Sequence, residues 1–330
     1  MRRRLIKCIL FISVFGVNAS YAQHTIHLSQ YLFNGLVVNP AYAGYRDNWT
    51  INASSRLQWE GVKGAPKTNT LSVDGALGED GNVGLGVLVS NERLGPEINT
   101  AGYINYAYRI KLSDDDSHRL SFGVAAGAVQ YAIDASLFNA GAAIDPTVTT
   151  GVQTKLAPDF RVGIYYYSPL FYVGASALNL IPNAYPDPNS IFVRETRTYY
   201  LTTGFIVPIS PVVNWRPSML VKEDFKGPTN INLSTYFLLA DMVWVGASYN
   251  SGVVLWNKSN LQTNLNTVGA VTGAVAVNIT PLCRFGYSYD FATSKLSGFQ
   301  GASHEISLSL GFSRRKDRVL SPRFFKLIKE

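Results

Sequence analysis

The sequence has few residues of the kinds that build disulfide frameworks, metal centres or charged surfaces. It contains 2 Cys and 4 His in 330 residues, too few for a disulfide scaffold, a zinc cluster or an iron–sulfur site. Charged residues make up 15% of the chain, against roughly 25% in a typical soluble domain. Low charge together with 47% hydrophobic residues argues against disorder, which requires the opposite composition.

Long apolar runs are also scarce, and the first residues are the exception. Residues 1–22 combine a basic start, an apolar stretch and the small residues Ser20 and Ala22, which predicts a secretory signal peptide cleaved before Gln23. A short membrane anchor is the alternative interpretation. No later stretch reaches ~18 consecutive apolar residues, so no transmembrane helix is predicted. The mature chain keeps one thiol, Cys283, and an exported chain without disulfides fits a Gram-negative envelope.

The formal net charge of +7 comes from the two ends of the chain. Residues 1–22 hold +4 and residues 313–330 hold +5, so subtracting both from +7 leaves −2 for the rest of the chain. A near-neutral body is not a phosphate-binding surface. We therefore expect no nucleic-acid partner.

Residues that commonly carry catalysis or bind metals form no recognisable pattern. His24, His27, His118 and His304 are scattered and lack metal-ligand spacing. The sequence has no P-loop and no Gly-x-Ser-x-Gly elbow, and residues 114–116 lack the remaining ligands of a calcium loop. We expect no enzyme activity and no cofactor. An outer-membrane lipase, which would need a Ser–His pair on the lipid face, is the enzymatic alternative.

Alternation of apolar residues with small or polar residues dominates from residue 47 to residue 313. In residues 103–112 and 282–291, one face would carry Ile104, Tyr106, Tyr108, Ile110, Leu112, Cys283, Phe285, Tyr287, Tyr289 and Phe291. The opposite face is mostly small or polar, with Tyr103 as an exception. Successive side chains of a strand point to opposite faces, so the pattern predicts strands with one bulky apolar face.

Two observations favour a membrane barrel over a soluble sandwich. The predicted strands run roughly 10 residues or more, the length needed to cross a bilayer at a tilt. Aromatic residues gather near strand ends, as interfacial girdles require; they include Trp49, Trp59, Tyr165, Tyr166, Tyr167, Tyr199, Tyr200, Tyr287 and Tyr289. We predict an all-β fold: a monomeric, antiparallel, up-and-down transmembrane β-barrel of about fourteen strands in the outer membrane, an even number as in bacterial barrels.

The connections divide into short turns and longer loops, which sets the orientation. Residues 168–169 are typical of a tight turn, whereas 135–157 and 181–194 are longer and precede strands. In such barrels short turns face the periplasm and long loops face outward, so both ends of an even-stranded barrel lie on the periplasmic side. The chain then divides into a signal peptide (1–22), a periplasmic or plug segment (23–46), the barrel (47–313) and a basic periplasmic tail (314–330).

Several short motifs resemble the PorP/SprF family. The most specific is Asn39-Pro40-Ala41-Tyr42-Ala43-Gly44, preceded by Ser29-Gln30-Tyr31-Leu32-Phe33-Asn34. Further matching stretches are Trp59-Glu60-Gly61, Leu120-Ser121-Phe122-Gly123, residues 158–166, Trp215-Arg216-Pro217-Ser218 and residues 303–308. The resemblance covers nearly the whole mature chain. It is a family of outer-membrane proteins of the type IX secretion system in Bacteroidetes.

The resemblance implies a function that alternation alone does not. It implies a non-enzymatic outer-membrane component that binds the C-terminal sorting domain of a secreted cargo protein or other type IX secretion components. It also implies a role in protein export, or in the surface attachment of gliding-motility adhesins. The alternative is a passive porin or small-solute transporter.

Two segments are candidate partner-binding surfaces. The first contains Tyr31, Asn34, Asn39, Pro40, Tyr42 and Gly44. A plain turn at residues 39–44 is the alternative, because Pro fixes φ and disfavours helix at the preceding residue; residues 28–38 are apolar enough to form a short plug at the lumen mouth. The second is the tail, with Arg314, Arg315, Lys316, Phe324 and Phe325, which would dock on a periplasmic partner or lie at anionic headgroups, unless it is a solvated end.

A set of charged residues falls on the faces predicted to line the lumen. It comprises Arg109, Lys111, Arg161, Arg284 and Asp290. These residues would either tune a pore or pair with one another and fill the interior. The second interpretation is favoured, because buried charges are normally paired.

Overall fold

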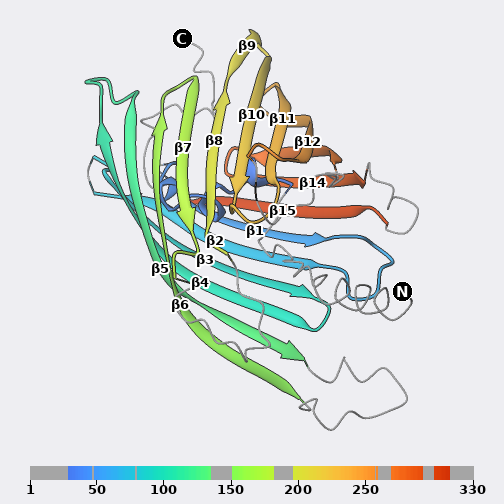
Figure 1. Ribbon diagram of the computed structural model, residues 1–330. Helices are drawn as coiled ribbons and strands as arrows, with labels where there is room; N and C mark the ends of the chain where they lie inside the picture. Colours follow the sequence, from blue (N-terminus) through green and yellow to red (C-terminus); the bar gives the residue numbers. More distant parts are fainter. Residues whose placement is uncertain are drawn as a thin grey trace, which may run out of the picture.

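One antiparallel sheet closes on itself to form a barrel in the computed structural model (Figure 1). The structure describes residues 29–46, 48–78, 80–134, 151–181, 196–256, 258, 269–292 and 301–312. Strands that follow one another along the chain pair with each other, except that β8 and β9 both pair with β10, and β1 (Trp49–Leu57) pairs with β15 (Ser303–Phe312) to close the ring. That closing register runs without a shift from Trp49↔Phe312 to Leu57↔His304.

The fifteen described strands occupy fourteen positions around the barrel, the number that the alternation predicted. Between β1 and β15 they are β2 (Lys67–Leu77), β3 (Val83–Leu94), β4 (Glu97–Lys111), β5 (Arg119–Asp134), β6 (Val152–Tyr167), β7 (Phe171–Leu178), β8 (Thr198–Phe205), β9 (Val207–Ser210), β10 (Val213–Glu223), β11 (Thr229–Leu239), β12 (Val243–Val253), β13 (Ala270–Thr280) and β14 (Cys283–Ala292). β8 and β9 are separated by Ile206 alone, and both pair with β10. They therefore act as one interrupted strand of the barrel wall.

The two faces of the strands follow the predicted alternation. On β4, Ile104 is 68% exposed on the outside, whereas its neighbour Tyr103 is 2% exposed inside. On β14, Phe285 and Phe291 point outward, and Arg284 and Asp290 are buried. The bulky apolar side chains therefore face lipid, and the small, polar and charged ones face the interior.

Some strand boundaries differ from the expectation. β6 begins at Val152, although residues 135–157 were expected to form a loop, because β5 pairs with it without a shift as far as Asp134↔Val152. Pro158 is accommodated within this strand, since proline is tolerated where its missing N–H faces away from the neighbouring strand. β13 begins at Ala270 rather than near residue 261.

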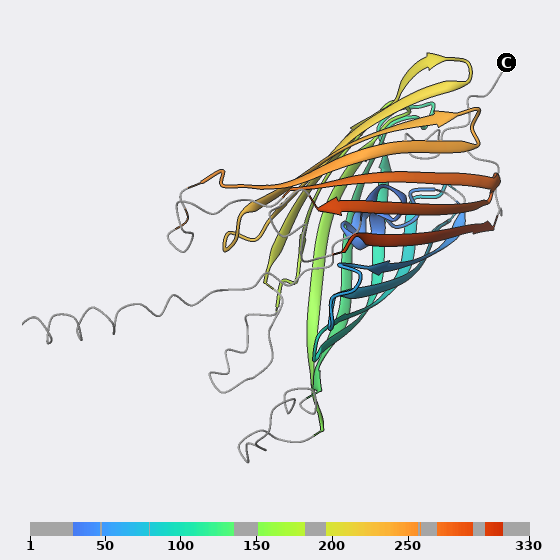
Figure 2. The ribbon, with the colours of Figure 1, turned by 90° about the vertical axis from the view of Figure 1, so that its right-hand side faces the viewer.

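The two ends of the barrel are different. At one end, which we call the inner end, six short connections join the strands at residues 78–82, 112–118, 168–170, 211–212, 240–242 and 281–282. β1 also starts and β15 also finishes there. The other end, which we call the outer end, carries the longer connections at residues 58–66, 135–151, 179–197, 254–269 and 293–302, and two shorter ones at residues 95–96 and 224–228. Figure 2 shows the strands from the side. Short turns face the periplasm in outer-membrane barrels, so we expect the inner end to face the periplasm.

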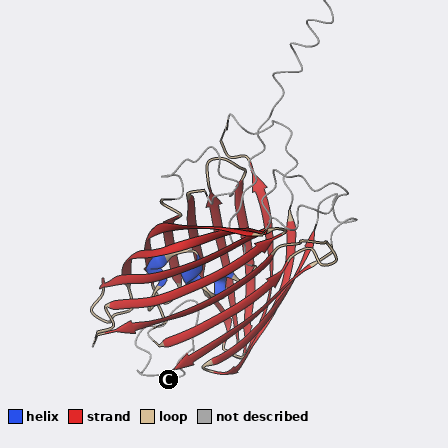
Figure 3. Ribbon diagram, turned by 90° about the horizontal axis from the view of Figure 1, so that it is seen from below, coloured by secondary structure: helices blue, strands red, loops and turns tan. Residues whose placement is uncertain are grey.

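Residues 29–46 lie inside the barrel. They form three short 3-10 helices, η1 (Tyr31–Phe33), η2 (Gly35–Val37) and η3 (Pro40–Tyr42), which Figure 3 shows enclosed by the strands. Asn39 caps η3, because its side chain accepts a hydrogen bond from the Ala41 N–H, and Pro40 occupies the first position of that helix. No helix among the described residues is long and apolar enough to cross a membrane.

Candidate functional site

The lumen segment, defined as residues 29–46, fills the barrel interior. Tyr31, Leu36 and Tyr42 are each 1% exposed. The segment starts near the outer end, where Ser29 contacts Glu305 of β15. It reaches the inner end at Gly44, whose carbonyl accepts a hydrogen bond from Arg109 of β4. The chain therefore runs through the lumen from the outer end to the inner end before β1 begins.

Aromatic rings from the lumen segment and the wall pack together at the inner half. The Tyr45 ring lies 4.8 Å from Tyr42, 5.4 Å from Tyr165 and 4.7 Å from Tyr167. We expected Tyr165, Tyr167 and Tyr200 to lie in the interfacial girdles, but all three are buried inside. Edge-to-face aromatic contacts of this kind add to the stabilisation that comes from burial. The interior is therefore a packed core.

The Asn39–Gly44 stretch binds the wall through main-chain and side-chain hydrogen bonds. The Asn39 Nδ2 donates to the carbonyls of Ile164, at 3.0 Å, and Ala175, at 3.3 Å. Ser121 Oγ donates to the Ala41 carbonyl over 2.7 Å. The Gly44 N–H donates to Asp74 Oδ2 over 3.1 Å. These contacts hold one short stretch against strands β2, β5, β6 and β7.

A row of small residues in the wall allows this close approach. Cross-strand pairing places one such residue on each of six successive strands: Ala76, Gly84, Ala107, Gly123, Gly163 and Ser176. A Cβ at Gly84 would lie 2.0 Å from the Ala43 carbonyl oxygen, and one at Gly163 would lie 2.0 Å from Asn39 Oδ1. At Gly123 it would lie 2.1 Å from the Ala41 nitrogen. Glycine is required here because the lumen segment touches the backbone of the wall.

A buried ionic network holds the start of the lumen segment at the outer end. Arg56 of β1 lies 2.5 Å from Asp290 Oδ2 of β14 and 3.3 Å from Glu305 Oε2 of β15. Ser29 joins both acids, since its N–H donates to Glu305 over 2.7 Å and its hydroxyl donates to Asp290 over 2.9 Å. Buried charges need such partners, because an isolated ion inside a protein is strongly unfavourable.

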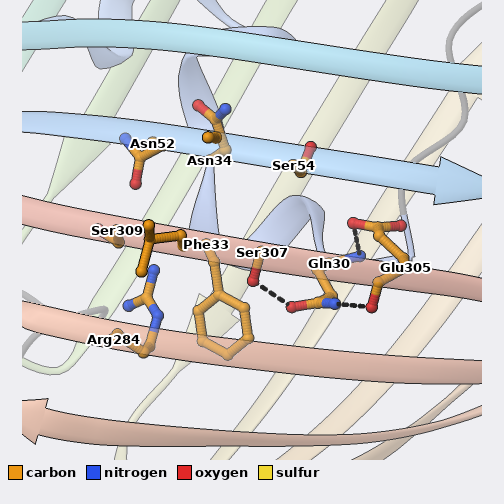
Figure 4. Close-up of a pocket in the computed structure, with 11 residues that line it drawn as sticks. Gln30, Phe33, Asn34, Asn52, Ser54, Arg284, Glu305, Ser307 and Ser309 are labelled. Carbon is orange, nitrogen blue, oxygen red and sulfur yellow. Dashed lines mark hydrogen bonds between the residues drawn. The ribbon is translucent and has the colours of Figure 1, made fainter.

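A small cavity lies between the lumen segment and strands β1, β14 and β15 (Figure 4). Gln30 crosses one side of it, accepting a hydrogen bond from Ser307 Oγ at 2.7 Å and donating to the Glu305 carbonyl at 2.9 Å. On the other side the Arg284 guanidinium lies 4.2 Å from the centre of the Phe33 ring, a cation–π contact.

Comparison with known proteins identifies the family. The sequence pattern of the type IX secretion system membrane protein PorP/SprF family matches residues 20–310. The chain belongs to this family. No curated protein matches it. The PorP/SprF chain is thus an outer-membrane β-barrel component of the type IX secretion system.

Solved structures share the barrel architecture of this PorP/SprF protein. The monoaromatic hydrocarbon channel CymD superposes with a TM-score of 0.52 at 11% identity, covering 88% of this chain and 94% of the channel. A FadL homologue from Pseudomonas aeruginosa gives a TM-score of 0.46 at 10% identity, covering 90% of this chain and 96% of the homologue. At these identities the likeness concerns the fold alone.

The PorP/SprF structure places the candidate partner-binding residues in the lumen rather than at a surface. Tyr31, Asn34, Asn39, Pro40, Tyr42 and Gly44 are all buried. Asn34 accepts a hydrogen bond from Ser72 Oγ at 3.1 Å, and the Tyr31 hydroxyl lies 3.2 Å from Ser218 Oγ. The tail candidates Arg314, Arg315, Lys316, Phe324 and Phe325 lie outside the described residues.

The candidate lumen residues do not form one cluster. Arg161 lies 3.8 Å from Asp159 and 3.4 Å from the centre of the Tyr103 ring, and Arg109 binds the Gly44 and Gly81 carbonyls at the inner end. Lys111 is at the inner rim, 3.2 Å from Asp80. Arg284 stacks on Phe33 and Asp290 pairs with Arg56.

Sequence reasoning missed three of the residues that hold the lumen segment: Arg56, Asp74 and Glu305. Each lies on the polar face of an alternating strand, and this was the available signal. In β1, Thr50, Asn52 and Arg56 share the interior face. Among the described residues, no group of three or more His, Cys, Asp or Glu side chains is arranged to hold a metal ion.

Proposed function

We propose that this type IX secretion component binds a protein partner and does not conduct small solutes. The partner would be the C-terminal sorting domain of a secreted cargo protein or another component of the secretion or gliding machinery. The observation that supports this proposal is the filled lumen. Side chains of the lumen segment pack against the wall from the outer end to the inner end.

A porin requires a water-filled channel through its barrel. Here the lumen segment is held at both ends, by the Arg56–Asp290–Glu305 network and by Arg109 with Asp74. Its withdrawal would leave buried charges and polar groups without their partners, which is costly. The segment is therefore a permanent part of the interior, and the barrel acts as a rigid support for its rims and loops.

The proposal includes the absence of enzyme activity. The side chain of His304 lies between the Tyr287 hydroxyl, at 2.8 Å, and Glu60 Oε2, at 3.0 Å, and these three side chains form a hydrogen-bonded trio. The trio contains no Ser or Cys nucleophile, and it ties β14 and β15 to the β1–β2 connection. We assign it a structural role.

Conductance and export assays test the proposal. The purified barrel should give no stable conductance in planar bilayers, and a variant that lacks residues 29–45 should give channel openings if it still assembles. A strain without the protein should lose particular proteins from its surface, and these should co-purify with the tagged wild-type barrel. An open wild-type channel with an unchanged surface proteome would instead support the porin alternative.

A further inference from the structure

Within the part of the chain that the structure describes, the barrel wall has a strand edge without a neighbour at its outer end. β5 pairs with β6 over the full length of β6, from Asp134↔Val152 to Arg119↔Tyr167. On its other side, β6 pairs with β7 only from Val162 to Tyr167. Among the described residues, the first part of β6 therefore has a strand neighbour on one side only. Figures 1 and 2 show β6 running past the end of β7.

A specific backbone conformation causes this opening. Asn179 directly follows β7 and has a φ of 57°, in the left-handed region that ends a strand. β7 therefore stops, and the last main-chain bond across this seam between residues that the structure describes is that from the Leu180 N–H to the Phe160 carbonyl, at 3.1 Å. Beyond it, β6 continues to Val152 without a β7 partner.

The direction of the main-chain groups follows from that last bond. The Phe160 carbonyl points away from β5, and main-chain direction alternates along a strand. The main-chain groups of Val152, Thr154 and Leu156 therefore also point to the open side. Pro158 belongs to the same set but has no N–H. Three residues thus present donors and acceptors at the spacing that another strand requires.

This edge also carries apolar side chains beyond the bilayer. A tilted strand crosses the membrane in about 9–11 residues, a length that β6 reaches at Pro158 when counted from Tyr167 at the inner end. Val152 and Leu156 lie farther out, yet they are 60% and 71% exposed. Apolar side chains on an unpaired edge are normally avoided, because they attract other strands.

We propose that the β6 edge at Val152–Leu156 binds an extended segment of a secreted protein, which adds to the barrel wall as an antiparallel or parallel strand. Strand addition uses main-chain hydrogen bonds for affinity and alternate side-chain contacts for selectivity. The segment would place apolar residues beside Val152 and Leu156. A secreted protein is the occupant because the family acts in protein secretion, and because the edge lies at the outer end. This inference rests on the proposed function and gives it a location.

Cross-linking in living cells tests the contact. A photo-reactive amino acid at Leu156 should cross-link to a secreted protein, whereas the same group at Val162, which is paired with Ala177 of β7, should not. Cross-linking of Leu156 to a second copy of the chain, or to this chain's own residues, would overturn the proposal. An equal yield at both positions would also overturn it.

A backbone variant tests the hydrogen bonds. Thr154→Pro removes an N–H that faces the open side and spares the β5 ladder, and Thr154→Ala is the matched control. The proline variant should lower the yield of the Leu156 cross-link and the surface amount of the captured protein about 3- to 10-fold, because one main-chain hydrogen bond is lost. Heat-dependent mobility on gels should show that the variant barrel still folds. If that variant fails to assemble, Leu156→Asp serves instead.

The outcomes separate this inference from the proposed function. If the strain without the protein loses surface proteins but the Thr154→Pro barrel restores them fully, the edge is not the binding site and the proposed function stands. If the strain without the protein keeps its full surface proteome, the proposed function fails first.

Discussion

The Ser29 N–H donates a hydrogen bond to Glu305 Oε2 over 2.7 Å, although the two residues are 276 positions apart in the chain. One belongs to the start of the lumen segment and the other to the last strand of the barrel. The bond shows that filling the lumen and closing the wall are parts of one structure. The same acids also bind Arg56 of β1, so both strands of the closing seam contribute.

Arg56 is expected to be the most sensitive residue of this network. Arg56→Ala would leave Asp290 and Glu305 buried without their cation, and such a loss costs about 3–5 kcal/mol. Urea unfolding of the refolded barrel in detergent measures the free energy of unfolding. Arg93→Ala, at an exposed position of β3, is the control and should change it by less than about 0.5 kcal/mol. Equal effects of the two substitutions would contradict a stabilising network.

Gly163→Ala should displace the lumen segment or strain the wall. The added Cβ would lie 2.0 Å from Asn39 Oδ1, and overpacking of this kind costs about 1–3 kcal/mol. Gly273→Ala in β13 is the control, because nothing lies within 4 Å of the added Cβ there. Thermal unfolding followed by gel mobility compares the two. A Gly163→Ala barrel as stable as the Gly273→Ala barrel would show that the contact is not close.

Asn39→Ala should destabilise the barrel through two separate losses. The helix η3 would lose its cap, and two wall carbonyls would lose the Asn39 amide donor. Together we expect about 1–3 kcal/mol, as for other buried hydrogen-bonding groups. Asn69→Ala, at an exposed site on β2, is the comparison. Chemical denaturation of both variants measures the difference, which should vanish if residues 39–44 are a turn without wall contacts.

Protease digestion should separate the lumen segment from ordinary loops. In the intact barrel, a cleavage site built in place of residues 35–38 should resist protease, because Leu36 and its neighbours are buried. A site in the β1–β2 connection at residues 60–63, which is exposed, should be cut. Cleavage of both at similar rates would mean that the lumen segment leaves the barrel readily.

Much of the fold was predictable because alternation is a local property. Residues 103–112 and 282–291 each show which side chain faces lipid without reference to any other strand, and the structure confirms both faces. The number of fourteen strands around the barrel followed from counting such stretches. The interior aromatic cluster was not predictable in this way, since Tyr165, Tyr166 and Tyr167 are identical in type and only the strand's rotation decides which two point inward.

The contacts of the lumen segment were less predictable because they join distant parts of the chain. The motif Asn39-Pro40-Ala41-Tyr42-Ala43-Gly44 indicated either a partner contact or a plain turn, and the structure has the short helix η3 with its Asn39 cap there. Which wall residues receive it depends on Gly84, Gly123 and Gly163 becoming neighbours across strands. On its own, each glycine indicates only a position where a strand is weakened.

The path of the lumen segment has a consequence for assembly. The segment is covalently joined to β1 at the inner end and enclosed by the strands (Figure 3). We therefore expect β15 to pair with β1 around a segment that is already in place, so that Glu305 contacts Ser29 late in assembly. A chain cut short before residue 303 should stall with residues 29–46 still accessible to protease.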